Sequence, residues 1–220
     1  SSVKVAGTGL PTVNGVPSGA AGDINTLYTG ANTLHYSIIG TATAIVPAWT
    51  STGLNLDQDA TDNDGIELSA PIGTNKKFVV GNEDFSLFLR STIAAPINIE
   101  FLLIGFRTSA AYQSADGAYT NYTNVAAVGF NAKAAAQAIK LWNKTTGTLN
   151  AADSGLTWAA GEAKYIDIKV AKDGTVTWLI NGQDVTSVVT SANGAAFKLT
   201  AGAVVTPFIY HQLGSGSGTT

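Results

Sequence analysis

Two turn dipeptides in the second half of the chain place the strongest constraint on its fold. Polar and apolar residues alternate over residues 164–171, and Asp173-Gly174 follows directly. A second strand-like run comes next and ends at Asn181-Gly182. Asp-Gly and Asn-Gly favour tight hairpin turns whose twist matches that of paired strands. The sequence therefore predicts an antiparallel meander over residues 164–188, whose alternating strand has one face in water.

Short apolar runs separated by turns continue through most of the chain. The one segment with helical propensity, residues 132–139, is too short to form a stable helix alone and is expected to be a loop or a single turn. Sandwiches of this length commonly form one domain, so we expect an all-β fold, a two-sheet antiparallel jelly-roll sandwich. The predicted strands are residues 34–39, 43–46, 54–56, 65–68, 78–80, 85–90, 97–106, 125–131, 138–143, 164–171, 175–180, 196–199 and 204–210.

The chain is poor in charge, which excludes several classes of partner. Charged residues make up 12% of the chain and its net charge is −3, whereas about a quarter is typical. No cluster of lysine and arginine is present to neutralise a nucleic-acid backbone. The most apolar run, residues 97–106, is too short to span a bilayer and contains Asn98 and Glu100. Cysteine is absent, so disulfides and thiolate zinc sites are excluded.

The first 32 residues differ from the rest because glycine and proline interrupt any regular pattern. They are nevertheless richer in apolar residues than a disordered tail. We expect an extended arm over residues 1–32, a sandwich over residues 33–213 and a flexible Gly/Ser tail over residues 214–220. Whether the arm lies on its own sandwich or on a neighbouring subunit stays open. The candidate partner-binding residues of the arm are Val3, Val5, Leu10, Val13, Val16, Ile24, Leu27 and Tyr28.

An acidic run over residues 57–67 is the one concentration of possible metal ligands. Oxygen-rich clusters suit Ca²⁺, but placing Gly65 at the sixth position of an EF-hand loop puts Pro71 where the bidentate acid belongs. A solvated turn is the favoured interpretation, although bound calcium is left open. The acids of the run are Asp57, Asp59, Asp62, Asp64 and Glu67.

No pattern of catalytic residues stands out. The two histidines, His35 and His211, are far apart in the sequence, and the glutamates stand singly, whereas glycosidases need a pair of carboxylates beside the sugar. Neither a Gly-x-Ser-x-Gly motif nor a phosphate-binding glycine loop is present. We therefore expect a protein that is not an enzyme and that uses no cofactor and no metal.

Aromatic residues offer candidate glycan contacts, because a ring can stack on the C–H groups of a sugar. Tyr112, Tyr119 and Tyr122 lie in a long loop over residues 108–124, and loops of that length are often functional. Trp158 lies in a glycine-flanked segment and is the tryptophan most expected to be exposed. The alternatives are a loop packed over the sandwich and a tryptophan in the core.

The second half resembles a known fold. Its series runs from Trp158 through the two turn dipeptides to Thr206-Pro207-Phe208, and it looks like the second half of a concanavalin/laminin-G-like jelly-roll. The stretches Pro47-Ala48-Trp49 and 62–68 (DNDGIEL) are similar to tailed-phage capsid decoration or cement proteins. That resemblance implies a non-enzymatic virion protein on the capsid exterior, a trimer whose arm binds the major capsid protein. The alternative is a carbohydrate-binding or lectin-like domain that attaches to surface glycans.

Overall fold

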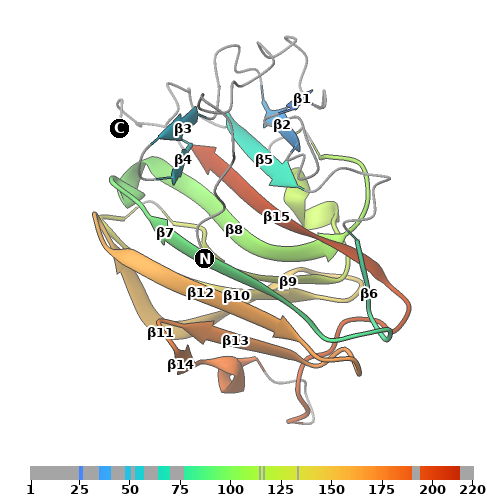
Figure 1. The fold of residues 1–220 in the computed structure, drawn as a ribbon. Coiled ribbons are helices and arrows are strands. Elements are labelled where there is room, and N and C mark those ends of the chain that lie inside the picture. Colours follow the sequence, from blue (N-terminus) through green and yellow to red (C-terminus); the bar gives the residue numbers. More distant parts are fainter. Residues whose placement is uncertain are drawn as a thin grey trace, which may run out of the picture.

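Two main antiparallel sheets face each other across an apolar core in the computed structural model (Figure 1). The structure describes residues 25–26, 35–40, 48–50, 53–56, 64–69, 77–113, 115, 117–132, 134–189 and 194–213. Within this part of the chain the fold is a β-sandwich of the jelly-roll type, which confirms the predicted fold class.

The larger of the two, here called the large sheet, contains strands from both halves of the chain, and β15 pairs with both β5 and β8 near its middle. β6 pairs with one end of β15. In spatial order its strands are β1 (Asn25–Thr26), β2 (His35–Ile39), β5 (Gly65–Ser69), β15 (Val204–Leu213), β8 (Ile99–Thr108), β9 (Val125–Phe130), β10 (Ala136–Lys144) and β11 (Asn150–Ala159), with β6 at Phe78–Val79.

The small sheet is the predicted meander with one additional strand. A further hairpin, β3 and β4, pairs separately, and three short 3-10 helices complete the described elements. In spatial order the small sheet contains β14 (Gln183–Asp184), β13 (Val176–Ile180), β12 (Ala163–Val170) and β7 (Phe85–Thr92). The remaining elements are β3 (Ala48–Thr50), β4 (Gly53–Asn55), η1 (Pro96–Asn98), η2 (Ala118–Asn121) and η3 (Thr186–Val188).

The meander forms where the turn dipeptides place it. Gly174 has φ 85° and Asn181 has φ 53°, values that glycine adopts freely and that asparagine tolerates better than most residues. In β12 the residues Ile166, Ile168 and Val170 are buried, and the residues between them point outward. The predicted antiparallel pairing and the predicted wet face are both confirmed.

The core between the sheets is apolar and rich in aromatic rings. Trp158 and Trp178 are fully buried in it. Phe78 stacks on Phe85 with ring centroids 4.7 Å apart, and Phe106 meets both rings edge-on. Burial on this scale is the main favourable term in the folding of a chain without disulfides.

The central strands of the large sheet are covered on both faces. Every residue of β9 is buried, which explains why it reads as a continuous apolar run instead of an alternating one. One face of β9 meets the small sheet, and the other contributes Val125 and Ala127 to a second cluster beneath the loop after β8. The large sheet is therefore the middle layer of this part of the molecule.

Three local expectations were wrong. Residues 136 and 137, expected to be a loop or a single turn, belong to β10, because pairing with β11 outweighs the helical propensity of this segment. In place of the predicted strand over residues 196–199, Lys198 forms an isolated bridge with Thr175. The segment around Trp158, interpreted as a loop, is the edge strand β11, where small residues face outward and Ser154 and Trp158 face inward. No helix within the described residues is long and apolar enough to cross a membrane.

The arm lies almost wholly outside the described residues. Of residues 1–32 the structure describes only Asn25 and Thr26, which pair with Tyr36 and His35 of β2 in the same chain. All eight candidate partner-binding residues of the arm lie outside the described part, as does the tail over residues 214–220.

Candidate functional site

The outward face of the small sheet carries an exposed pair of aromatic side chains. Phe88 of β7 is 65% exposed and Tyr165 of β12 is 45% exposed. Their ring centroids lie 6.2 Å apart with 29° between the ring planes, so the two rings are stacked on the surface. We call Phe88 and Tyr165 the aromatic platform. Single exposed apolar residues are ordinary, but paired exposed rings on one face are informative.

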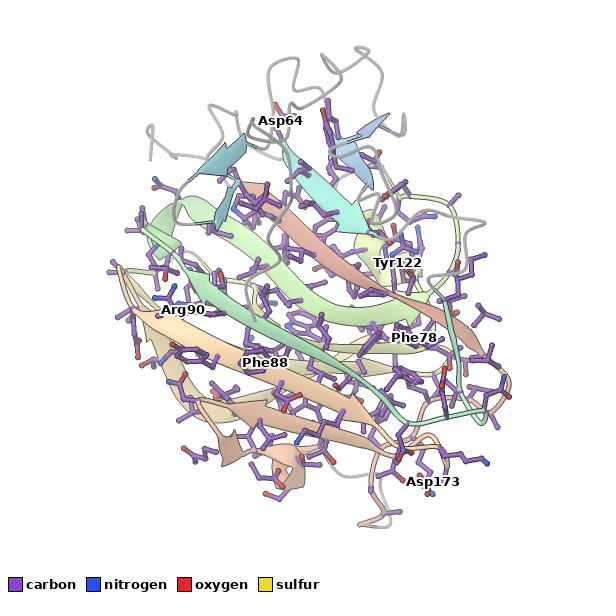
Figure 2. All side chains as sticks on the ribbon, in the orientation of Figure 1. Asp64, Phe78, Phe88, Arg90, Tyr122 and Asp173 are labelled. Carbon is purple, nitrogen blue, oxygen red and sulfur yellow. The ribbon has the colours of Figure 1, made fainter. Side chains whose placement is uncertain are left out.

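The strand register explains why these two side chains meet. Tyr165 stands directly opposite Arg90, and Phe88 stands directly opposite Asp167. Because alternate residues of a strand share one face, Phe88 and Arg90 point outward from β7 together. Figure 2 shows both side chains beside β7 and β12, and β7 is the last strand of the small sheet.

Arg90 extends the platform with a cation. Its Cζ atom lies 5.9 Å from the centroid of the Tyr165 ring, a distance within the range of a cation–π contact. The side chain is exposed, and it forms no ion pair with any residue in the part of the chain that the structure describes.

Polar groups surround the platform and fix its backbone. Asp167 and Lys169 form an ion pair at 3.3 Å on the same face. The backbone N–H of Tyr165 donates to Oδ1 of Asn181 at 2.9 Å, which ties the start of β12 to the turn after β13. Thr177 stands opposite Lys169 and is half-buried. The surface is therefore a stacked pair of rings with hydrogen-bonding groups at its rim.

The long loop whose tyrosines were predicted to bind glycans differs from the aromatic platform, because Tyr112 and Tyr122 contact a buried ion pair. Within residues 109–124, the hydroxyl of Tyr122 donates to Glu67 Oε2 at 2.5 Å and accepts from the backbone N–H of Gln113 at 2.8 Å. Glu67 Oε1 receives the Nε–H of Arg107 at 2.6 Å, and both side chains are fully buried. We call Glu67, Arg107, Tyr112 and Tyr122 the Glu67 cluster. Figure 2 shows Tyr122 near β5, well away from Phe88.

Arg107 holds the loop by several kinds of contact. Its Nη1 donates to the backbone oxygens of Thr108 at 2.9 Å and of Ala110 at 3.1 Å. Its Cζ lies 4.0 Å from the centroid of Tyr122 and 5.6 Å from that of Tyr112. The Arg107 Nη2 and the Tyr112 hydroxyl have no hydrogen-bond partner in the described part of the chain. The cluster therefore clamps the loop onto the large sheet at some cost in unpaired polar atoms.

Burial controls the protonation of this cluster. Burial raises the pKa of the Glu67 carboxyl, against the opposing effects of the Arg107 charge and of the Tyr122 hydrogen bond. Burial, followed by the charge of Glu67, also raises the pKa of the Tyr122 phenol and that of the Tyr112 phenol. Both phenols therefore stay protonated at neutral pH, as the donation from Tyr122 to Glu67 requires.

Three of the four residues predicted to bind glycans are buried and not available for stacking, so that expectation is wrong for Tyr119, Tyr122 and Trp158. Tyr119 and Tyr122 are buried, and Tyr119 packs against Phe101, Trp142 and Tyr210. Tyr112 is half-buried with its hydroxyl covered. Trp158 is 0% exposed, and its Nε1–H donates to the backbone oxygen of Glu162 at 3.0 Å. The alternative, a loop packed over the sandwich and a tryptophan in the core, is the one observed.

The acidic run does not form a metal-binding site within the described residues. Asp57, Asp59 and Asp62 lie outside them, Asp64 is buried, and Glu67 is bound to Arg107. No group of three or more potential ligands occurs within the described ranges. Burial lowers the pKa of His211 to about 4, so this imidazole is neutral, while the side chain of His35 is not described.

The platform residues were missed, although the sequence contained a signal for them. In β7 the residues Ser86, Phe88 and Arg90 share one face, while Leu87 and Leu89 share the other. A phenylalanine on the face of an alternating strand that otherwise carries polar residues indicates a contact with a ligand or a partner. The alternation of β12 likewise had already placed Tyr165 on the wet face.

No family model matches the chain, and no curated protein matches it. Among the solved structures that resemble it is that of the polysaccharide lyase family 18 protein aly-SJ02 r-CATD, with 9% identity and a TM-score of 0.43 over 81% of this chain and 68% of that chain. Another is domain 4 of AbnA, a GH43 extracellular arabinanase from Geobacillus stearothermophilus, in complex with arabinotriose, with 13% identity and a TM-score of 0.41 over 81% of this chain and 82% of that domain. At these scores neither likeness carries weight for the function of this chain.

Proposed function

We propose that the chain is a non-enzymatic binding module that holds a glycan on the aromatic platform. The observation that carries this proposal is the exposed, stacked pair of Phe88 and Tyr165 on one sheet face. Full burial of a large apolar side chain is worth roughly 1.5–3 kcal/mol, and these two rings, which stay 65% and 45% exposed, forgo part of it. A sugar ring recovers part of that free energy, because its C–H groups pack on the ring faces while its hydroxyls stay hydrated.

The rim of the platform suits a polar ligand. Asp167, Lys169 and Thr177 place an acceptor, a donor and a hydroxyl on the same face, and sugar hydroxyls both donate and accept. Asp167 is held in its ion pair with Lys169. We therefore propose that this surface offers the ligand contact area and hydrogen bonds and that it carries out no catalytic step.

A double variant, Phe88→Ala with Tyr165→Ala, tests this function. Each ring stacked on a sugar is worth about 1 kcal/mol, so losing both weakens glycan binding roughly thirtyfold. The wild type is first screened on a glycan array, and the variants are then measured by isothermal titration calorimetry. Ile97→Ala is the matched control, because Ile97 is 52% exposed but lies outside the small sheet. Absence of any array signal, or unchanged affinity in the double variant, would contradict the proposal.

A second candidate is the virion role that the sequence resemblance implies. Its support is the arm over residues 1–32, which holds eight candidate apolar contact residues in a chain that is only 12% charged. In this role the protein is a trimer on the outside of a phage head, and the arm bridges major capsid proteins through apolar burial and main-chain pairing. Repeated placement on a symmetric shell would add avidity to weak contacts.

Truncation of the arm tests the virion role. Deleting residues 1–24 keeps the pairing of β1 with β2, so the shortened chain is expected to fold with the same melting temperature. Its co-sedimentation with capsids from the same source is expected to be lost, whereas the full chain co-sediments. Equal co-sedimentation of the two chains, or none by the full chain, would remove this candidate.

A further inference from the structure

The charges around the aromatic platform do not balance. Asp167 and Lys169 neutralise each other at 3.3 Å. At the far end of β7, Asp84 Oδ1 accepts the backbone N–H of Lys172 at 2.6 Å. Across β13, the Asp184 carboxylate accepts the backbone N–H of Thr186 at 2.8 Å. None of these acids pairs with Arg90.

Beside Tyr165, the neighbouring charges are also matched. Glu162 and Lys164 form an ion pair with each other, and the Lys164 side chain is largely buried. The exposed guanidinium of Arg90 is therefore the cation next to the platform that lacks an acidic partner within the described residues. A neutral ligand would leave this charge unused.

The geometry of Arg90 favours an anion on the ligand. Phe88 and Arg90 are two residues apart on one strand, so their Cα atoms lie about 7 Å apart. A saccharide stacked on the rings thus has its substituents within reach of the guanidinium. The planar fork of arginine binds carboxylate or sulfate oxygens in pairs, and contact with the Tyr165 ring restricts its movement before the ligand arrives.

We propose that the ligand of the aromatic platform is an anionic saccharide whose carboxylate or sulfate group pairs with Arg90. This inference rests on the proposed glycan-binding function and specifies the class of glycan. The rings supply contact with the sugar, and Arg90 supplies the preference for charge.

The test compares ligands that differ only in charge. Oligogalacturonate is titrated against its neutral methyl ester, and sulfated dextran oligosaccharide against plain dextran oligosaccharide of equal length. We expect at least one acidic member to bind about tenfold more tightly than its neutral counterpart, and we expect the preference to shrink as salt is raised. The first pair identifies a carboxylate ligand and the second a sulfate ligand.

Variants assign the preference to one side chain. Arg90→Gln is expected to reduce the preference to less than about twofold, and Arg90→Lys to keep only part of it, because lysine retains the charge and loses the planar fork. Lys172→Gln removes the same charge from the exposed turn after β12 and is expected to leave the preference unchanged. Unchanged melting temperatures show that the variants remain folded.

The outcomes separate this inference from the function beneath it. If neutral and acidic members bind equally and the Phe88→Ala, Tyr165→Ala variant still loses affinity, the glycan-binding function stands and the anionic class is wrong. If neither acidic member binds, or if Arg90→Gln keeps the full preference, the inference is also overturned. If the double variant binds every ligand as the wild type does, the function itself fails.

Discussion

In the described part of the chain an arginine lies over a tyrosine ring at two sites, and the two sites have opposite surroundings. In the Glu67 cluster, Arg107 lies 4.0 Å from the Tyr122 centroid, fully buried and bound to a carboxylate. On the small sheet, Arg90 lies 5.9 Å from the Tyr165 centroid, exposed and without an acidic partner among the described residues. The polar groups of the buried site bind other residues of the fold, whereas the guanidinium of the exposed site remains accessible to a ligand. Residue type alone therefore does not distinguish a structural contact from a recognition surface.

The largest effect is expected from breaking the ion pair of the Glu67 cluster. Glu67→Gln leaves the buried guanidinium of Arg107 without its countercharge, so the free energy of unfolding should fall by about 3–5 kcal/mol in urea denaturation. The double variant Glu67→Leu with Arg107→Met should lose much less than the sum of the single variants, because the unpaired Arg107 Nη2 disappears with it. A loss below about 1 kcal/mol in Glu67→Gln would show that the cluster is no clamp.

The next effect concerns His211 in the large sheet. Its pKa is about 4 in the folded chain, below its ordinary value of 6.5, because burial disfavours the charged ring. Between these values the unfolded chain binds the extra proton, so stability is complete above pH 6.5 and falls as the pH drops toward 4, by about 3 kcal/mol. In a series of urea titrations over this range, His211→Asn should show a shallower pH slope than the wild type. Equal slopes would contradict this assignment.

A smaller effect is expected from the hydroxyl that joins the loop to Glu67. Tyr122→Phe removes a donor to Glu67 and an acceptor of the Gln113 N–H, so the free energy of unfolding should fall by about 1–3 kcal/mol. Glycan binding should not change, because Tyr122 is buried far from the platform. Weakened binding with unchanged stability would reverse the assignment of the two regions.

The smallest change in stability is expected at the platform itself. Phe88→Ala and Tyr165→Ala remove exposed rings, and such substitutions usually alter the free energy of unfolding by no more than about 0.5 kcal/mol. Their effect should appear in ligand affinity alone. A loss of stability comparable to that of Tyr122→Phe would show that the rings serve the fold.

The sequence predicted the meander of the small sheet, though not its pairing with β7, because the signals of the meander are local. Asp173-Gly174 and Asn181-Gly182 set the turns, and the alternation of β12 set which residues face water. The Glu67 cluster could not be predicted in this way. Its ion pair joins residues of β5 and β8, and these two strands are brought close together only because each of them pairs with β15. The sequence around Glu67 and the sequence around Arg107 contain no local pattern that predicts the contact between them.

Errors at Trp158 and at the loop tyrosines have related physical causes. The strand β11 contains several Ala residues together with Asn, Asp and Gly, which are depleted in strands, and its pairing with β10 determines its structure. The tyrosines of the loop are as amphipathic as surface tyrosines, and their burial depends on a sheet face that is itself apolar. Composition cannot reveal that a second layer covers that face.

The position of β7 at the edge of the small sheet affects which ligands the aromatic platform can bind. Among the described strands, β7 pairs on one side only, so a long polymer that reaches the platform can extend beyond this side of the sheet. Grip of this kind grows with the number of repeats touched and depends little on where the polymer begins or stops. Attachment and release would then be governed by ligand length more than by the fit of any single sugar unit.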